Sequence, residues 1–300
     1  MNAIFRMLGV SKQSFHQQLD RRLQKLEEEG NLLPLIRQIR EDHPRLSARK
    51  MYSLIRPSFI GRDQFEAFCF EHGFKLEVKK SWTKTTNSLG VTRFPNLLLE
   101  FEVTGVNQVW VSDITYYRIA DRFYYLTFIM DLHSRRIVGY SVSKDLSTEN
   151  TTIVALKQAI YLRKPSSVLI LHSDGGGQYY CKEFLKITRK YGIRNSMCDT
   201  VYENPHAERI NGIIKNDYVS HYGPESFDRL KLMVKKAVEM YNYIRPHGSL
   251  SGLSPITFEE LLTKPLVLNK RKKNQKRKDI TTNLIFENRY KNLLKTVNVI

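Results

Sequence analysis

The strongest constraint on the fold is a strand-rich block at residues 108–143, followed by alternating helix and strand patterns. Five segments combine β-branched, aromatic or apolar residues with flanking turn residues: 108–117, 122–131, 135–143, 167–174 and 193–197. Three helical patterns lie among or after the last of these: 147–162, 182–192 and the segment that begins at Asn204-Pro205. The resulting order, β-β-β-α-β-α-β-α, predicts an α/β domain with a mixed sheet.

The first 79 residues have a different, helical pattern. Three short helices are indicated: 32–41, ended by His43-Pro44; 48–55, with Ser47 as N-cap; and a third opened by Asp63 and ended by Gly73. Residues 8–22 look like the turn and second helix of a further such motif, whose first helix would precede Met1. A helix-turn-helix DNA-binding module and an ordinary three-helix bundle explain this pattern equally well.

The charge of the chain narrows its partners. It has 48 lysines and arginines against 30 aspartates and glutamates, a formal net charge of +18. This balance predicts a polyanionic partner, and we favour nucleic acid over an acidic membrane surface. No apolar run reaches the roughly 18–20 residues of a spanning helix. Cys69, Cys181 and Cys198 form no CxxC pair, so we expect free thiols and no zinc site.

These patterns divide the chain into four parts. Residues 1–79 form the helical region, 80–104 a polar linker, 105–262 the α/β domain and 263–300 a basic tail. The tail includes the run LNKRKKNQKRKD at 268–279, which has no apolar periodicity. Such a run is typical of a solvated arm that contacts phosphates without sequence preference.

Two aspartates stand at the ends of predicted strands. Asp113 follows the apolar strand start Val109-Trp110-Val111, and Asp174 ends the run VLILHS. A carboxylate at the end of a buried strand is costly unless it is solvated or binds a metal. Either aspartate alone is more simply explained as a turn residue or a helix cap. The Gly175-Gly176-Gly177 run lacks the ending of a phosphate loop, so we interpret it as backbone clearance.

A third carboxylate, Glu208, lies on the predicted helix that begins at Asn204-Pro205. At about 100° per residue, one side of this helix carries apolar residues: Ala207, Ile210, Ile213, Ile214 and Tyr218. The other side carries Glu208, Asn211, Gly212 and Lys215. Taken alone, Glu208 and Lys215 are ordinary solvated residues. Together, two strand-end aspartates and one outward glutamate can hold two divalent cations, preferably Mg²⁺ or Mn²⁺, for chemistry on a phosphodiester.

Five motifs then carry a family resemblance. They occur in the order WVSDITYY, IMDLHSRRIVGYSVS, HSDGGGQYY, NPHAERINGIIKNDY and YNYIRPHGSLSGLSP. Together they resemble the DDE integrase core of the insertion-sequence-three transposases, in the form of the OrfB-type product. The resemblance covers residues 105–262; residues 8–60 resemble, less closely, the helix-turn-helix region before that core. It implies an RNase H-like α/β fold, a mixed sheet flanked by helices and preceded by an all-α region.

The resemblance implies a catalytic and metal-binding triad of Asp113, Asp174 and Glu208. Sixty residues separate the two aspartates, as in the family, and 33 separate Asp174 from Glu208, slightly fewer than usual. The shortening falls in the loop 198–204, where a change of length costs little free energy. Glu203 is the nearest alternative third carboxylate, and we interpret it as a helix-start residue.

The resemblance also suggests DNA contacts. Lys215 matches a lysine that contacts DNA near the cut end, and Arg245 matches a residue of the carboxy-terminal core motif. Arg209 and Asn211, beside Glu208, complete the predicted DNA contacts. Asp131 is expected to close a turn, and packing or capping is expected for His172 and His206.

The predicted function is a transposase that cleaves insertion-element ends and transfers the 3′-OH to target DNA with two Mg²⁺ ions. The expected partners are DNA, further copies of the chain on DNA, and an upstream-frame (OrfA-type) product or its frameshift fusion. We expect the protein in the bacterial cytoplasm, at the nucleoid. The main alternative is a catalytically idle or partner-dependent DNA-binding regulator of transposition; a sequence-independent RNase H-like nuclease is the third.

Overall fold

The computed structural model describes residues 9, 11–77, 94–166, 168–198, 204–263 and 290. The chain divides into two compact units: Met1–Glu77 with Asp279–Ile300, and Val78–Lys278. Most of the expected basic tail lies outside the described residues. Tyr290 is buried, and its hydroxyl donates to Asp42 Oδ2 at 2.6 Å, whereas the basic run at 268–279, for which a solvated arm is expected, lies outside the described residues.

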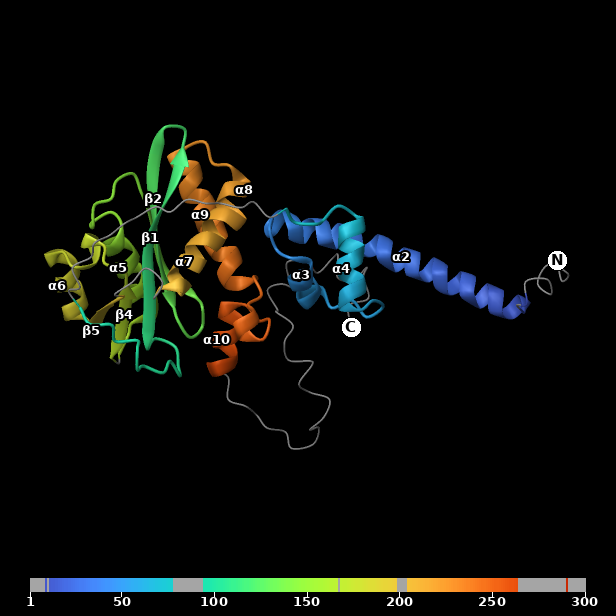
Figure 1. Ribbon diagram of the computed structural model, residues 1–300, viewed down its shortest axis with the longest axis horizontal. Helices are drawn as coiled ribbons and strands as arrows, with labels where there is room; N and C mark the ends of the chain where they lie inside the picture. Colours follow the sequence, from blue (N-terminus) through green and yellow to red (C-terminus); the bar gives the residue numbers. More distant parts are fainter. Residues whose placement is uncertain are drawn as a thin grey trace, which may run out of the picture. The chain divides into compact units, whose positions relative to one another are not determined.

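Three described helices build the first unit: α2 (Lys12–Asp42), α3 (Ala48–Ile55) and α4 (Arg62–Glu71), shown in Figure 1. The structure corrects the sequence interpretation of α2, because residues 12–22 of the segment predicted at 8–22 and the helix predicted at 32–41 belong to one 31-residue helix. Gly30 does not interrupt it, since an interior glycine costs only about 1 kcal/mol. The helix-turn-helix interpretation of this unit remains a prediction.

The apolar periodicity of this region is confirmed where it matters for the core. Leu32, Leu35, Ile36 and Ile39, predicted to share one helix face, are all fully buried. Helices α3 and α4 pack together through an edge-to-face contact of Tyr52 and Phe65, with ring centroids 5.6 Å apart. The first unit therefore has an apolar core of its own.

The second unit is built on a five-stranded sheet with the order β3-β2-β1-β4-β5. Its strands are β1 (Val109–Ile119), β2 (Arg122–Asp131), β3 (Ile137–Ser143), β4 (Leu169–Ser173) and β5 (Ile193–Met197). The pairs β1–β2 and β2–β3 are antiparallel, whereas β1–β4 and β4–β5 are parallel. All five strands lie close to their predicted positions, and the mixed RNase H-like sheet is confirmed.

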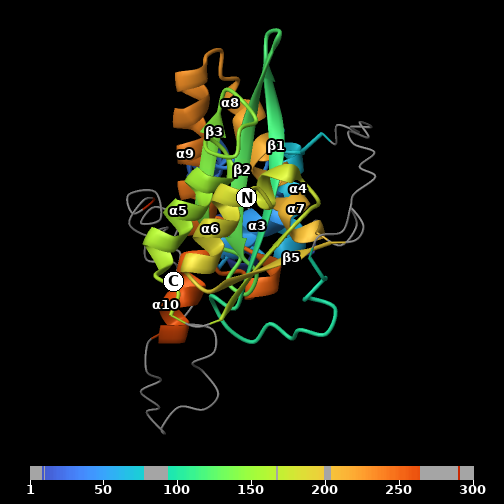
Figure 2. The same cartoon turned by 90° about the vertical axis from the view of Figure 1, so that its left-hand side faces the viewer.

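Helices cover both faces of this sheet (Figures 1 and 2). They are α5 (Thr152–Arg163), α6 (Lys182–Lys190), α7 (Pro205–Gly212), α8 (Ser220–Tyr222), α9 (Phe227–Tyr243) and α10 (Pro255–Thr263). Short 3₁₀ segments are η1 (Gly177–Tyr179) and η4 (Gly248–Leu250), and η3 (Ile213–Val219) is π-helical. Helix α5 begins at Thr152, five residues later than the helical pattern predicted at 147–162, and Thr151 at its N-cap position makes no side-chain capping hydrogen bond.

The two faces of β1 have different roles. Trp110 belongs to the apolar cluster that includes residues of α5 and α6, with Ile114 packed against it. The alternate positions, such as Asp113, face α7, because side chains along a strand point alternately to opposite faces. Helix α5 approaches β3 closely, since a Cβ added at Gly139 would lie 2.1 Å from the Ala155 carbonyl oxygen. The α5 side is thus closely packed, and the polar residues collect on the α7 side.

None of the described helices is both long and apolar enough to span a membrane.

Candidate active site

Asp113 stands where β1 leaves its parallel neighbour. Pairing of β1 with β4 ends at Ser112 and Ser173, and Asp113 is the next residue. Its Oδ1 accepts a hydrogen bond from the Ile114 backbone N–H at 2.8 Å, and its Oδ2 accepts one from Asn211 Nδ2 at 2.8 Å. Burial raises the pKa of Asp113 to about 7, with a further rise from the negative charge of Asp174 and a smaller one from Glu208. The site therefore strongly disfavours an uncompensated charge on Asp113.

Asp174 occupies the equivalent place on the neighbouring strand. It directly follows Ser173, the last residue of β4, so the two aspartates succeed the last residue pair of two parallel strands. Burial raises the pKa of Asp174, while a hydrogen bond from the Gly176 N–H to Oδ1, at 3.2 Å, opposes the rise. The expected strand-end position is therefore confirmed for Asp174 but wrong for Asp113, which lies inside β1 because β1 continues to pair with β2 after it leaves β4.

The glycine run after Asp174 provides clearance at two of its three positions. A Cβ at Gly175 would come within 2.8 Å of Met197 Cε, and one at Gly176 would lie 3.1 Å from Asp174 Oδ1. Gly177 has no atom within 4 Å of such a Cβ, so the clearance interpretation does not extend to it. The close approach at Gly176 lets its backbone N–H reach the carboxylate.

Glu208 comes from α7, which is tied directly to β1. Asn204 occupies the N-cap position, as predicted, but its side chain does not cap the helix. Its Nδ2 instead donates to the Ser112 carbonyl oxygen at 3.0 Å, one residue before Asp113. This contact places the first turn of α7 beside the aspartates. Glu208 is exposed there, as predicted, and its charge acts on Asp113.

The helix continues after Gly212 as predicted, but with a π-helical segment, η3. Four of the predicted inward residues, Ala207, Ile210, Ile214 and Tyr218, are buried, whereas the fifth, Ile213, is only half-buried. Asn211 was predicted to face outward as a DNA contact, and the structure corrects this. It is 5% exposed and donates to Asp113, because a buried amide needs a hydrogen-bonding partner and the carboxylate supplies one.

Lys215 lies half-buried beside the same strand. Its Nζ donates to Thr115 Oγ1 at 3.3 Å and lies 5.3 Å from the centre of the Tyr116 ring. Burial lowers the pKa of Lys215, and the negative charge of Asp113 opposes this. The lysine therefore contacts β1 two residues beyond Asp113 and lies within the electrostatic influence of that aspartate.

The charges of Asp174 and Glu208 act on Asp113, but the three side chains are not gathered closely enough to form a metal site. Among the described residues, no three His, Cys, Asp or Glu side chains are gathered closely enough to hold a metal ion. The donor set nevertheless fits Mg²⁺, because it consists of hard carboxylate oxygens. The repulsion that Asp174 and Glu208 exert on Asp113 is also what a bound cation would relieve.

Comparison with known proteins agrees with this geometry. Residues 103–202 and 192–255 each match a family described as an integrase core domain. A protein of insertion element IS600 from Shigella sonnei is 33% identical over 206 residues, which cover 67% of this chain and 75% of that protein. Transposase InsF of insertion sequence IS3A from Escherichia coli K12 is 32% identical over 163 residues, 53% of this chain and 56% of that protein. The chain belongs to the IS3 family of transposases.

Among solved structures, this transposase is similar to the HTLV-2 integrase catalytic core domain determined in complex with magnesium. The TM-score is 0.41 at 26% identity, and the match covers 50% of this chain and 94% of that one. The integrase core family match and the transposase relatives confirm the predicted family, and DNA transposition by a DDE-type enzyme is the activity of the chain. Membership of the family implies the use of a divalent metal ion.

The IS3-family transposase does not present all of the predicted DNA contacts to solvent. Arg245 is 4% exposed, and its Nη2 donates to Asp217 Oδ2 at 2.6 Å. The predicted phosphate contact of Arg245 therefore conflicts with the structure, because its guanidinium is buried in an ion pair. Arg209 is exposed on α7 directly after Glu208, which is compatible with its predicted role. Glu203, the alternative third carboxylate, lies outside the described residues.

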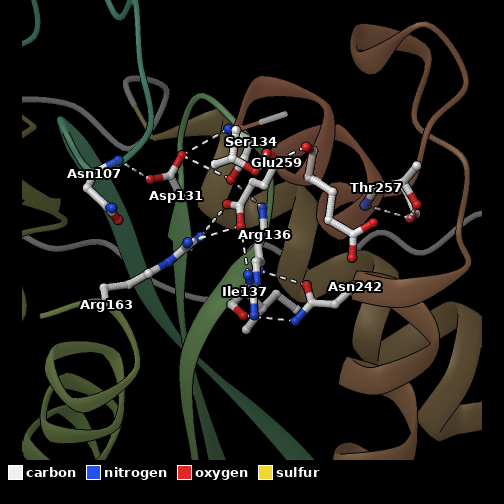
Figure 3. A network of polar contacts seen from close by, with 12 residues as sticks. Asn107, Asp131, Ser134, Arg136, Ile137, Arg163, Asn242, Thr257 and Glu259 are labelled. Carbon is white, nitrogen blue, oxygen red and sulfur yellow. Dashed lines mark hydrogen bonds and ion pairs between the residues drawn. The ribbon is translucent and has the colours of Figure 1, made fainter. Parts of the chain in front are cut away.

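The residues expected to be structural behave as such. Asp131 accepts hydrogen bonds from the backbone N–H groups of Asn107, His133 and Ser134, as Figure 3 shows in part, and its carbonyl oxygen accepts one from the Arg135 N–H at 2.9 Å. It closes the turn between β2 and β3 as predicted.

The two histidines are held by neighbouring side chains. The Nδ1 of His172 lies 2.9 Å from Ser196 Oγ, and that of His206 lies 3.0 Å from Arg135 Nη1. Burial and the charges of Arg135 and Arg209 lower the pKa of His206 to about 4. His206 is therefore neutral near pH 7 and can accept the hydrogen bond from Arg135.

Sequence reasoning missed Tyr179 as a neighbour of the site. Its hydroxyl lies 2.9 Å from Ser112 Oγ, and its pKa is raised well above the usual value by burial and by the charges of Asp174 and Asp113. Its position five residues after Asp174, in the QYY of the third motif, was the available signal. Tyr179 therefore contacts β1 at Ser112, directly before Asp113, and does so as a neutral hydroxyl.

Proposed function

We propose that this transposase cleaves DNA at insertion-element ends and transfers the resulting 3′-OH to target DNA, with Asp113, Asp174 and Glu208 as catalytic residues. The main support is that the charges of two further carboxylates, Asp174 and Glu208, both act on Asp113, at the place where β1 leaves β4. Because the protein is strongly basic and belongs to this family, DNA is the polyanion that it binds in this proposal.

Each residue of the site has a role in this proposal. Asp113, Asp174 and Glu208 supply oxygen ligands for two Mg²⁺ ions, or Mn²⁺ in their place, which when bound activate the attacking oxygen and stabilise the leaving one. Asn211 holds Asp113 through Oδ2, so that the carboxylate keeps one orientation. Lys215 and Arg209 contact phosphates beside the cut end. In the first step water breaks a phosphodiester and frees a 3′-OH; in the second that hydroxyl attacks a target phosphodiester and displaces its 3′ oxygen.

The remaining parts of the chain serve DNA binding in this proposal. The helical region 1–79 binds the element ends, and the basic run at 268–279 adds affinity for DNA of any sequence. Several copies of the chain act together on DNA, with an upstream-frame product as a further partner. The reaction takes place at the nucleoid, where its DNA is found.

Strand transfer in vitro tests the proposal. The full chain is incubated with Mg²⁺, a labelled oligonucleotide of the native element end and a supercoiled target, beside Glu208→Gln. We expect joined product from the wild type only, since glutamine keeps the size of the side chain but removes its charge. Equal joining by both would remove Glu208 from the triad. Binding without joining by either, reversed when the upstream reading frame is fused on, would favour the partner-dependent regulator.

Lys215→Ala is expected to weaken binding to DNA of any sequence and to lower the salt slope of binding by about one unit, as for the loss of one phosphate contact. Fluorescence anisotropy with a labelled duplex at several salt concentrations measures this slope. Lys157→Ala, an exposed lysine on α5 across the sheet, is the matched control and should leave the slope unchanged. A slope that Lys215→Ala does not alter would exclude this lysine from the phosphate contacts.

A further inference from the structure

The hairpin of β1 and β2 extends beyond the rest of the sheet. Within the described residues, β1 has a strand partner on only one side after Ser112, because its pairing with β4 ends there while its pairing with β2 continues to Ile119 and Arg122. Figure 2 shows the two strands projecting past their neighbours. The projecting part begins at Asp113, so its base belongs to the candidate active site.

The two faces of this hairpin are unequal. On one face Tyr124 stacks on Phe227 of α9, with ring centroids 5.3 Å apart at an angle of 25°. On the other face Tyr116 is 37% exposed and Phe123 is 48% exposed, and their rings meet edge-to-face at 5.4 Å. Two neighbouring aromatic rings are therefore open to solvent on the hairpin face opposite to the Asp113 side chain.

Cations accompany both open rings. Lys215 Nζ lies 5.3 Å from the centre of the Tyr116 ring, and the Arg118 guanidinium lies 6.0 Å from that of Phe123. Arg118 also pairs with the exposed Asp121, an ion pair that solvent weakens. We call Tyr116, Arg118, Phe123 and Lys215 the aromatic–basic patch. Flat rings with adjacent positive charges are what a single nucleic-acid strand requires, since its bases stack and its phosphates are anionic.

We propose that the aromatic–basic patch binds an unpaired nucleobase of DNA, with Tyr116 and Phe123 stacking on the base and Lys215 and Arg118 on the adjoining phosphates. The proposal rests on the proposed DNA-cleaving function for its biological setting, and it deepens that function by naming the form of the substrate. Lys215 connects the patch to the candidate active site, because its Nζ donates to Thr115, two residues from Asp113.

The test compares two labelled single strands with the full-length protein: an oligo(dT) and a strand of equal length made of abasic residues. The basic tail and the other phosphate contacts act on both probes, so they largely cancel in the ratio of dissociation constants. We expect the wild type to bind oligo(dT) about 10-fold or more tightly than the abasic strand, the usual size of base–aromatic stacking. Equal binding of both probes by the wild type would overturn the proposal.

Variants locate the preference. The double variant Tyr116→Ala/Phe123→Ala should reduce the ratio to near one. The variant Phe123→Leu keeps an apolar side chain without a flat ring and should reduce the ratio partly. Its thermal unfolding midpoint should stay close to that of the wild type. Tyr116→Phe should preserve the ratio, and so should the matched control Tyr161→Ala, an aromatic residue on α5 that is 82% exposed. A ratio that the double variant leaves unchanged would place stacking elsewhere and overturn the proposal.

The outcome is independent of the catalytic proposal. A wild type that prefers bases but joins no DNA with Mg²⁺ would count against the catalytic proposal and leave the patch standing. A wild type that joins DNA but shows no preference for bases would do the reverse.

Discussion

Asp113→Asn should abolish strand transfer while DNA affinity stays within about twofold of the wild type. Asparagine has the same shape, so an oxygen remains for the Asn211 amide that Oδ2 now accepts at 2.8 Å. What is lost is the negative charge at the point where the other two carboxylates act. A metal ligand contributes several kcal/mol to the transition state of phosphoryl transfer, which corresponds to a rate loss of about 10³-fold or more.

Joining and binding must be measured on the same preparations. Gel electrophoresis of joined product gives the first, and anisotropy with the element-end duplex gives the second. Asp228→Asn is the matched control, because Asp228 lies in the first turn of α9 and its side chain is 90% exposed. It should change neither quantity. A parallel loss of joining and binding in Asp113→Asn would mean that the aspartate supports the structure of β1 and not the chemistry.

The sheet could be predicted because its signals are local. The runs from Val109 to Ile119 and from Leu169 to Ser173 are dense in β-branched and apolar residues, and each ends near a turn residue. The position of Asp174 follows from the same reasoning, since it succeeds β4, whereas Asp113 lies inside β1, directly after the pairing of β1 with β4 ends. In this part of the chain, local preference and tertiary structure require the same conformation.

The errors have a common physical cause, which is that contacts distant in sequence decide the role of polar residues. A helical wheel placed Asn211 outward, but the amide faces β1 because Asp113 is there to accept its hydrogen bond. The π-helical segment after Gly212 also departs from the 100° wheel. Arg245 matched a family motif, yet Asp217, 28 residues earlier, buries it in an ion pair. Nothing in the spacing of either residue reveals its partner.

A buried ion-pair network joins α10 to the sheet and to α5 (Figure 3). Glu259 Oε2 accepts hydrogen bonds from Arg136 Nη1 at 2.7 Å and from Arg163 Nη1 at 3.0 Å, and its Oε1 accepts one from Arg163 Nη2. Burial on its own raises the pKa of Glu259, but hydrogen bonds from Arg163, Ser134 and Arg136 outweigh it, so that its pKa is lowered. The carboxylate is therefore more favourable in the folded chain than in the unfolded one.

The pH dependence follows from this direction. Because the folded pKa is below the ordinary glutamate value of 4.5, the contribution of the network is fully present above about pH 4.5. It is lost as the pH falls through the folded pKa, where the carboxylate takes up a proton. A variant without the charge should thus differ from the wild type at neutral pH and approach it in acid.

Glu259→Gln should lower the free energy of unfolding by about 3 kcal/mol at pH 7, since it leaves two largely buried guanidinium groups without their carboxylate. Urea denaturation followed by tryptophan fluorescence measures this, because Trp110 is fully buried in the apolar cluster of the second unit. The exposed neighbour Glu260→Gln should change it by less than about 0.5 kcal/mol. If both substitutions had the same cost, or if the difference between Glu259→Gln and the wild type persisted undiminished in acid, the ion pairs of Glu259 would not be what holds α10 to the sheet.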